Sequence, residues 1–238
     1  MNFQDKYSLV EGVFSSVYSK YDLMNNVMSF GLHKLWKREL LKEIVINDDE
    51  LSVVDVASGT GDIIIAIRKK FTDFINTRYI AVDSNINMLN EGRKKIIDKN
   101  FTDIESINAD AESLPIEDSS LTHYIISFGI RNVSNITQAL DEAYRVLKPN
   151  GKFICLEFSH VQHPLLKSIY KVYSKFCIPQ LGSLIAGDKE AYEYLVDSIA
   201  KFPTPEKFNQ LIKGSGFINN GYRLMNNGII AIHTGWKN

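Results

Sequence analysis

From residue 51 onward, short runs of β-branched and apolar residues alternate with segments whose apolar positions recur at helical spacing. This alternation is typical of βαβ units, which build a largely parallel sheet. Helices are predicted to begin near Asp62, Ile86 and Ile136, with a shorter one after Pro115. The predicted strands cover residues 51–58, 78–84, 104–110, 123–130, 152–159, 222–225 and 229–236.

The ends of the chain add helices and a hairpin to this core. Ser134 is predicted to cap a helix that ends at the Pro-Asn-Gly sequence 149–151. Thr204 is predicted to open a later helix, followed by two antiparallel strands joined through Asn-Asn-Gly. We expect one domain over 1–238: a helical cap (1–50), the core (51–159), a helical insertion (160–203), and a final helix with its hairpin (204–238).

Composition limits the class of protein. The 238 residues are 45% hydrophobic and 23% charged, and the formal net charge of -1 lacks the basic excess expected of a protein that binds nucleic acid. Cys155 and Cys177 form no CxxC pair, which favours buried thiols in a reducing compartment. The N-terminal residues lack a secretory signal, and the apolar runs are too short to span a bilayer. We expect a cytoplasmic protein whose membrane contact, if it has one, is peripheral.

The sequence DVASGTGD, residues 55–62, is predicted to form a ligand-binding turn. Gly59 and Gly61 follow the first strand, where open α/β sheets bind ligands and where glycine allows close approach of the backbone. Carboxylates at Asp55 and Asp62 would repel a pyrophosphate and attract a cation. S-adenosylmethionine, with its sulfonium and ammonium groups, meets that requirement. The alternative is that Asp62 merely complements the helix dipole and that Asp55 is an ordinary strand residue.

Polar residues at three further strand ends point to the same ligand. Asp83 lies about 20 residues after the turn, where an acid reaches the ribose hydroxyls of an adenosine ligand, although it could instead cap the next helix. Asp110 could accept a hydrogen bond from the adenine amino group. Ser127 ends the fourth strand, where the reacting end of the ligand should lie.

Two longer motifs resemble one family. YDLMNNVMSFGLHKLW, residues 21–36, matches the Y-D-x-M-N-x-x-[apolar]-S-x-x-x-H-x-x-W signature of the ubiquinone/menaquinone biosynthesis C-methyltransferases, and RVLKPNGKF resembles their second signature. The similarity extends over nearly the whole chain. One departure is Asn150, where the family usually has glycine, and asparagine tolerates the left-handed geometry that this position would need.

The resemblance implies a fold, a cofactor and a reaction. The fold would be a Rossmann-like class I methyltransferase, with a mostly parallel seven-stranded sheet and an antiparallel C-terminal strand. The reaction would move a methyl group from S-adenosylmethionine to a ring carbon of a polyprenylated benzoquinol or of a demethylmenaquinol, without a metal. The family's cofactor positions correspond here to Thr60, Asp83, Asp110, Ala111 and Ser127. Thr60 and Ala111 rest on the resemblance alone.

Four residues are candidates for the chemistry. Arg131, four residues after Ser127, could stabilise a phenolate on the acceptor, or it could be a surface arginine paired with Glu142. The other candidates, from the N-terminal signature, are Tyr21, Asp22 and His33.

The segment 165–176, LLKSIYKVYSKF, is predicted to form an amphipathic helix. Its apolar side chains fall on one arc, while Lys167, Lys171 and Lys175 lie on the other. This pattern is typical of a helix at a membrane surface, and a prenylated acceptor would have to be collected from a membrane. The alternative is a surface helix packed on the domain with solvated lysines.

Alternatives to the leading function stay open at this point. A related enzyme could methylate oxygen or nitrogen of another small hydrophobic acceptor. A protein of another class could bind the methyl donor without catalysis and serve as a scaffold for quinone biosynthesis. The sequence does not separate ubiquinone from menaquinone precursors, and it leaves open a homodimer or an assembly with other quinone-biosynthesis proteins.

Overall fold

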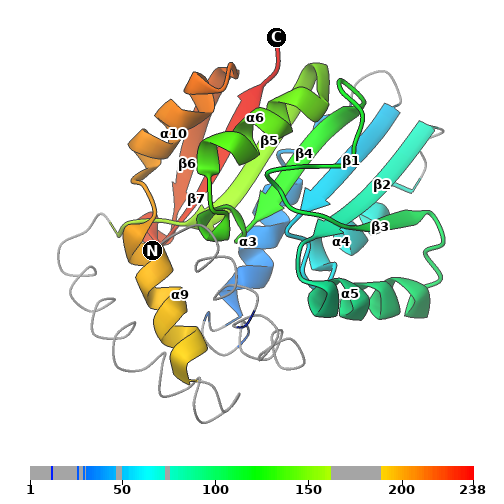
Figure 1. Ribbon diagram of the computed structural model, residues 1–238, viewed down its shortest axis with the longest axis horizontal. Coiled ribbons are helices and arrows are strands. Elements are labelled where there is room, and N and C mark those ends of the chain that lie inside the picture. Colours follow the sequence, from blue (N-terminus) through cyan, green and yellow to red (C-terminus); the bar gives the residue numbers. More distant parts are fainter. Residues whose placement is uncertain are drawn as a thin grey trace.

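A single twisted sheet forms the centre of the molecule (Figure 1). The computed structural model describes residues 12, 26, 29, 31–46, 50–72, 76–161 and 189–238. The seven strands have the order β3-β2-β1-β4-β5-β7-β6, and β7 is the strand that runs antiparallel to both of its neighbours. Their bounds are β1 Glu50–Val56, β2 Asn76–Asp83, β3 Ile104–Asn108, β4 Leu121–Ser127, β5 Leu147–Phe158, β6 Ile218–Met225 and β7 Ile230–Trp236.

The strand order reverses between β1 and β4. These two strands pair in parallel, with Asp55 opposite Ile125, and the chain leaves them toward opposite edges of the sheet. Such a reversal leaves a crevice beyond the carboxyl ends of the two strands, where α/β proteins bind their ligands. The topology therefore places the ends of β1, β2 and β4 around one site.

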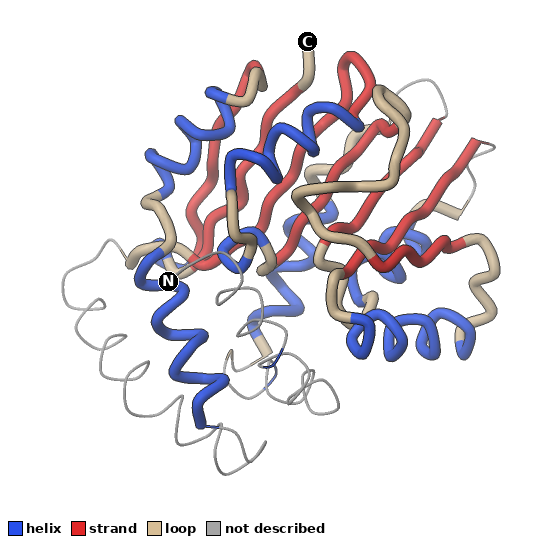
Figure 2. The backbone as a smooth tube through the Cα atoms, viewed as in Figure 1, coloured by secondary structure: helices blue, strands red, loops and turns tan. Residues whose placement is uncertain are grey.

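Helices cover both faces of the sheet (Figure 2). Alternate β1 residues point to opposite faces: Val54 packs into the layer below α6 and α10, and Val53 packs into the layer below α3, α4 and α5. This two-sided burial explains why the central strands are almost continuously apolar. The helices are α3 Leu32–Leu41, α4 Asp62–Lys70, α5 Ile86–Asp98, α6 Ile136–Val146, α9 Lys189–Lys201 and α10 Pro205–Gly214, with short turns η2 Ile130–Asn132 and η4 Asn226–Gly228.

Several predicted boundaries are confirmed. Thr204 caps α10 by accepting a hydrogen bond from the Lys207 amide, and Pro205 occupies the first turn. The last two strands form the expected hairpin, although β6 begins at Ile218 rather than at residue 222. Asn150 adopts the left-handed conformation, with φ of 63°, that its place in the motif suggested.

Other boundaries were wrong. Asn135, not Ser134, caps α6: its side chain accepts from the Gln138 amide, while the Ser134 amide donates to the carboxylate of Glu112. The helix ends at Val146 because the next residue already has extended backbone angles and begins β5.

The predicted helix after Pro115 is also absent from the described residues 116–120. The Arg145 guanidinium donates to the carbonyl of Ile116 and to the Asp118 carboxylate, and it thereby holds this segment in an irregular path.

Some predictions fall on parts of the chain outside the described residues. These are Tyr21, Asp22, Cys177 and the amphipathic segment 165–176. Cys155, in contrast, is buried in the sheet as predicted. Within the described ranges, no helix combines the length and the apolar character that a bilayer crossing requires.

Candidate methyl-donor site

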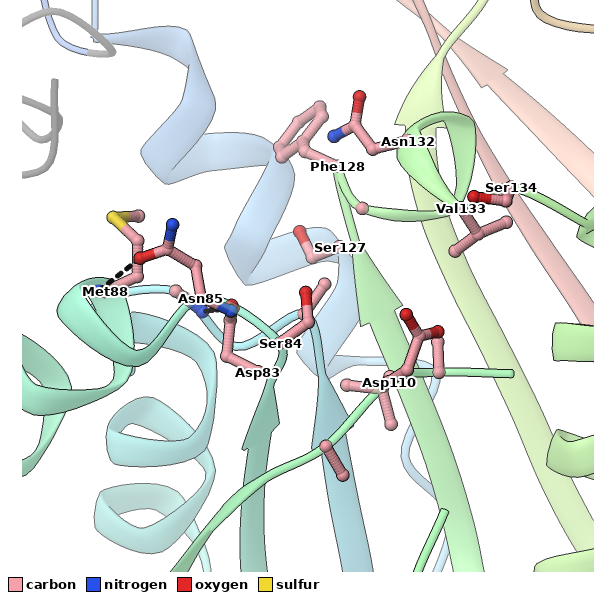
Figure 3. A pocket seen from close by; sticks show the side chains of 16 residues that line it. Asp83, Ser84, Asn85, Met88, Asp110, Ser127, Phe128, Asn132, Val133 and Ser134 are labelled. Atoms are coloured by element: carbon pink, nitrogen blue, oxygen red, sulfur yellow. Dashed lines mark hydrogen bonds between the residues drawn. The ribbon is translucent and has the colours of Figure 1, made fainter. Parts of the chain in front are cut away.

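A pocket opens beyond the carboxyl ends of the central strands. Its lining comes from residues 56, 57 and 59 at the end of β1, 83–85 and 88 at the end of β2, 109–111 after β3, and 127–129 and 132–134 at the end of β4. Figure 3 shows Asp83 and Asn85 on one side of the pocket and Phe128 and Asn132 on the other, with Ser127 between them. The lining includes five of the predicted cofactor residues: Gly59, Asp83, Asp110, Ala111 and Ser127.

The glycine turn has the backbone geometry that its sequence requires. Gly59 and Gly61 have φ of 55° and 77°, values that favour glycine, and Gly61 precedes the first residue of α4. Helix α5 packs against the turn so closely that a Cβ on Gly92 would lie 3.1 Å from the Gly59 carbonyl oxygen. The backbone of α5 therefore supports the turn on one side, and Gly59 lines the pocket.

Asp83 is held as a hydrogen-bond acceptor at the pocket wall. One carboxylate oxygen accepts from the Gly59 amide at 2.7 Å, and the other accepts from the Asn85 amide at 2.8 Å. Burial raises the pKa of Asp83 to about 6, although both amides oppose this shift. The side chain that caps α5 is Asn85, which accepts from the amides of Asn87 and Met88. Asp83 is therefore not the cap of this helix, and its carboxylate is available to a ligand.

Asp55, the first of the two acids that flank the glycine turn, does not present a negative charge to the pocket as predicted. Asp55 is 1% exposed, accepts from the Ile64 amide, and lies outside the described lining of the pocket. Burial raises its pKa to about 8, which favours the protonated form at neutral pH.

Asp62 keeps its charge but shares it. Its two oxygens lie 3.1 Å from Lys37 Nζ and 3.4 Å from Lys95 Nζ. Burial is the largest single influence and raises the pKa of Asp62, but the two lysines together outweigh it and lower the pKa. The expectation of two free carboxylates beside the ligand is therefore wrong, because burial favours the protonated form of Asp55 and lysines of α3 and α5 pair with Asp62.

Thr60 and Gly61 also lie outside the described lining. Thr60 is 5% exposed, and its hydroxyl accepts a hydrogen bond from Lys95 Nζ at 2.9 Å. In this structure Thr60 ties the glycine turn to α5.

Ser127 and Asp110 face the pocket from β4 and from the turn after β3. The Ser127 hydroxyl oxygen is buried, and no group in the described part of the chain hydrogen-bonds to it. A buried hydroxyl that lines a pocket without a partner is a place where a ligand's polar atom can bind. Asp110 accepts from the Glu112 amide at 2.9 Å, which fixes one carboxylate oxygen and the course of the turn.

Arg131 is neither a surface residue nor part of the described lining. Its guanidinium lies 2.8 Å from the carboxylate of Glu157, and the two side chains are 4% and 0% exposed. Glu142, the alternative partner from the sequence, pairs instead with Arg145. His33, in α3, is 8% exposed and shares a hydrogen bond of 2.9 Å with Ser29, so it too lies away from the described lining.

Sequence reasoning missed several residues that line the pocket. Asn85, Met88, Phe128 and Asn132 are the clearest examples. A signal was present for two of them, since Asn85 lies two residues after Asp83 and Phe128 directly follows Ser127. Phe128 has φ of 58°, which is uncommon for an aromatic residue and marks this turn as a constrained one.

Comparison with known proteins supplies the family. Residues 1–237 match the model of the ubiE/COQ5 methyltransferase family. A "Ubiquinone/menaquinone biosynthesis C-methyltransferase UbiE" of Rickettsia prowazekii is 50% identical over 240 residues, which cover 100% of this chain and 96% of the relative. A protein with the same name from Rickettsia bellii is 50% identical over 236 residues, 98% of this chain and 94% of the relative.

Solved structures share the fold at low sequence identity. A SAM-dependent methyltransferase of Thermotoga maritima, described as a possible histamine N-methyltransferase, has a TM-score of 0.67 at 19% identity and covers 95% of this chain and 99% of its own. Phosphoethanolamine N-methyltransferase 2 of Haemonchus contortus, solved with S-adenosyl-L-methionine, has a TM-score of 0.64 at 13% identity, covering 84% of this chain and 52% of its own.

The low-identity structures establish the fold alone, and they confirm the predicted class I methyltransferase architecture with its antiparallel β7. The full-length family match and the relatives that share half of their residues with this chain go further. On these grounds the chain belongs to the ubiE/COQ5 methyltransferase family.

Proposed function

We propose that the protein transfers a methyl group from S-adenosylmethionine to a ring carbon of a prenylated quinol in respiratory quinone biosynthesis. The acceptor is a polyprenylated benzoquinol of the ubiquinone pathway, a demethylmenaquinol, or both. The observation that carries the proposal is family membership over residues 1–237, together with relatives named as C-methyltransferases of both pathways. The enzyme is accordingly a C-methyltransferase.

The pocket fits the methyl donor in three respects. Asp83 provides a buried carboxylate for the two ribose hydroxyls, next to a turn where Gly59 has no side chain. Asp110 provides an acceptor for the adenine amino group. The Ser127 hydroxyl, which has no hydrogen-bond partner among the described residues, suits the polar methionine end. When bound, the donor supplies an electrophilic methyl group on a sulfonium.

The remaining contribution of the chain is alignment and exclusion of water. Methyl transfer requires sulfur, methyl and acceptor carbon in line, so positioning supplies much of the rate. Phe128 lines the pocket, and its ring lies 4.8 Å from that of Phe158 and 6.2 Å from that of Trp36. The Phe128 ring offers an apolar surface for an aromatic acceptor away from water, and the rings of Phe158 and Trp36 support it from behind.

A prenylated acceptor is dissolved in a membrane, and we propose that the protein works from the cytoplasm and contacts the bilayer surface. The support is the sequence pattern of residues 165–176, an apolar arc opposite three lysines. Sedimentation with anionic vesicles tests this contact. Replacement of Lys167, Lys171 and Lys175 by glutamate should abolish binding, and unchanged binding would refute the assignment of these lysines.

A methyl-transfer assay tests the function. Purified protein is incubated with methyl-labelled S-adenosylmethionine and short-chain prenylated quinols kept reduced, and the labelled product is analysed by NMR. Label on a ring carbon supports the proposal, and label on oxygen or nitrogen supports the other kind of methyltransferase. Donor binding without transfer to any quinol supports the scaffold. Asp83→Ala should lose activity, while Asp141→Asn, at an exposed position of α6, serves as the control.

A further inference from the structure

An ion pair is buried behind the donor pocket. Glu157 Oε1 lies 2.8 Å from Arg131 Nη1 and also accepts from the Phe158 amide at 2.8 Å. The Arg131 amide donates to the other oxygen at 3.4 Å. Because both side chains are almost fully buried, removal of one charge would leave the other without hydration by solvent. The pair therefore fixes the local geometry of whatever Arg131 contacts.

Arg131 contacts the turn that forms one wall of the pocket. Its guanidinium donates to the carbonyl oxygen of Phe128, three residues earlier. Phe128 has left-handed backbone angles, and its amide donates to the Leu156 carbonyl at 2.8 Å. A phenylalanine holds this conformation only when its surroundings impose it. Arg131 and Glu157 supply part of that constraint through the hydrogen bond to the Phe128 carbonyl.

The same arginine also contacts helix α9, which lies beyond the carboxyl edge of the sheet (Figure 1). Arg131 Nε donates to the Ser198 hydroxyl at 3.3 Å. One turn earlier on α9, the Tyr194 hydroxyl donates to Asn132 Oδ1 at 3.2 Å. Residues four apart lie on one face of a helix, so α9 is attached to η2 at two adjacent points. Asn132 lines the pocket, which brings this attachment to the ligand site.

We propose that Glu157 is a positioning residue for methyl transfer: through Arg131 it fixes the 128–132 turn at the donor pocket and holds α9 against that turn. The inference rests on the proposed function, and it assigns Arg131 a role different from stabilising the acceptor's phenolate. The contacts of Arg131 support this assignment, because its guanidinium binds the Phe128 carbonyl, the Glu157 carboxylate and the Ser198 hydroxyl.

The consequence is a link between the donor pocket and helix α9. The 128–132 turn lines the pocket proposed for the donor, and α9 is attached to this turn through Arg131 and Asn132. A shift of about 1 Å in reacting groups can lower a rate by about a hundredfold. Loss of the Glu157 carboxylate should therefore affect both donor affinity and turnover, whereas loss of the α9 contact alone should affect turnover.

The decisive variants separate these effects. Glu157→Gln keeps the shape and removes the charge, and we expect a donor Kd about tenfold higher and a kcat about a hundredfold lower. Arg131→Lys keeps the charge but loses the planar fork, and it should behave like Glu157→Gln. Ser198→Ala should lower kcat about tenfold with a donor Kd within twofold of wild type. Glu105→Gln, which breaks an exposed glutamate–arginine pair with Arg78, is the matched control.

Hydrogen exchange gives a readout that does not depend on the acceptor. Amides of residues 128–132 and 193–201 should exchange faster in Glu157→Gln, and those of 193–201 faster in Ser198→Ala.

If Glu157→Gln does not fold, the test uses Ser198→Ala and Tyr194→Phe, since neither removes a charge. A wild-type protein that binds the donor but methylates no quinol refutes the proposed function alone, because donor Kd and exchange still decide the role of Glu157.

Two results would overturn the inference. One is Glu157→Gln with donor Kd, kcat and exchange all within twofold of wild type. The other is Arg131→Lys with wild-type exchange and donor Kd but a shifted acidic limb in the pH profile of kcat/KM for the quinol. That second pattern would mean that Arg131 acts on the acceptor itself.

Discussion

Gly129, which follows β4, packs closely against Ala57, which follows β1, and its replacement by alanine should disturb the donor pocket. A Cβ at Gly129 would lie 2.4 Å from the Cβ of Ala57. Carbon atoms in contact lie about 3.5–4.0 Å apart, so the two backbones must separate by more than about 1 Å. Overpacking of this kind costs about 1–3 kcal/mol. Both residues line the pocket, so the displacement should also weaken donor binding.

The assay combines thermal unfolding with titration of the donor. Gly129→Ala should lower Tm by about 2–12 °C, since each kcal/mol shifts Tm by about 2–4 °C in a domain of this size. Donor Kd should rise about tenfold, as expected for the loss of one good contact. Gly221→Ala is the control, because a Cβ there meets nothing within 4 Å.

A second replacement tests the cause. In the double variant Ala57→Gly, Gly129→Ala, the methyl group moves from one strand end to the other, and the clash disappears. Gly129 has φ of -113°, which alanine tolerates, while Ala57 has φ of 53°, which glycine prefers. The double variant should therefore recover Tm and donor affinity. An unchanged Tm in Gly129→Ala, or a double variant no better than the single one, would refute the steric explanation.

Three further predictions concern Asp83 and Asn85 in the pocket wall and the buried acid Asp55. Asp83 should make donor binding pH-dependent, because its pKa is about 6 without ligand and ribose hydroxyls favour the ionised carboxylate. The donor Kd measured by calorimetry should rise about tenfold from pH 7.5 to pH 5. A Kd that does not change with pH would exclude this role. Asn85→Ala removes the α5 cap and should lower stability to chemical denaturation by about 1 kcal/mol, whereas Asn85→Ser should retain most of it. Asp55 has a folded-state pKa raised to about 8 from an ordinary value of 3.8, so between these two pH values the folded state binds the proton more tightly than the unfolded state does. The free energy of unfolding should therefore fall as pH rises from 4 to 8. Asp55→Asn should lose that part of the slope, and an identical slope in both proteins would show that Asp55 does not titrate as described.

Much of the donor pocket could be predicted because the signals are local. Asp83 and Ser127 each end a strand that is recognisable from its own apolar run, and parallel strands bring their carboxyl ends to one edge. Gly59 follows the first such strand. A pattern of strands and helices is therefore enough to gather these residues, even though they are far apart in the chain.

The roles of the charged residues could not be predicted in the same way. Arg131 is 26 residues from Glu157 and 67 from Ser198, and nothing in the local sequence connects them. Asp55 and Asp62 look alike in the sequence, yet burial favours the protonated form of one, and the other is shared by lysines from α3 and α5.

The sequence by itself determined the α/β architecture, the glycine turn, the strand-end residues of the pocket and, through its long motifs, the family. Only the tertiary structure decided which of the acids carry a charge, that Arg131 faces Glu157 rather than Glu142, and that α9 is attached to the pocket through η2. The physical reason is that backbone geometry and apolar periodicity are written in neighbouring residues, whereas ionisation and ion pairing depend on burial and on partners that folding brings from elsewhere.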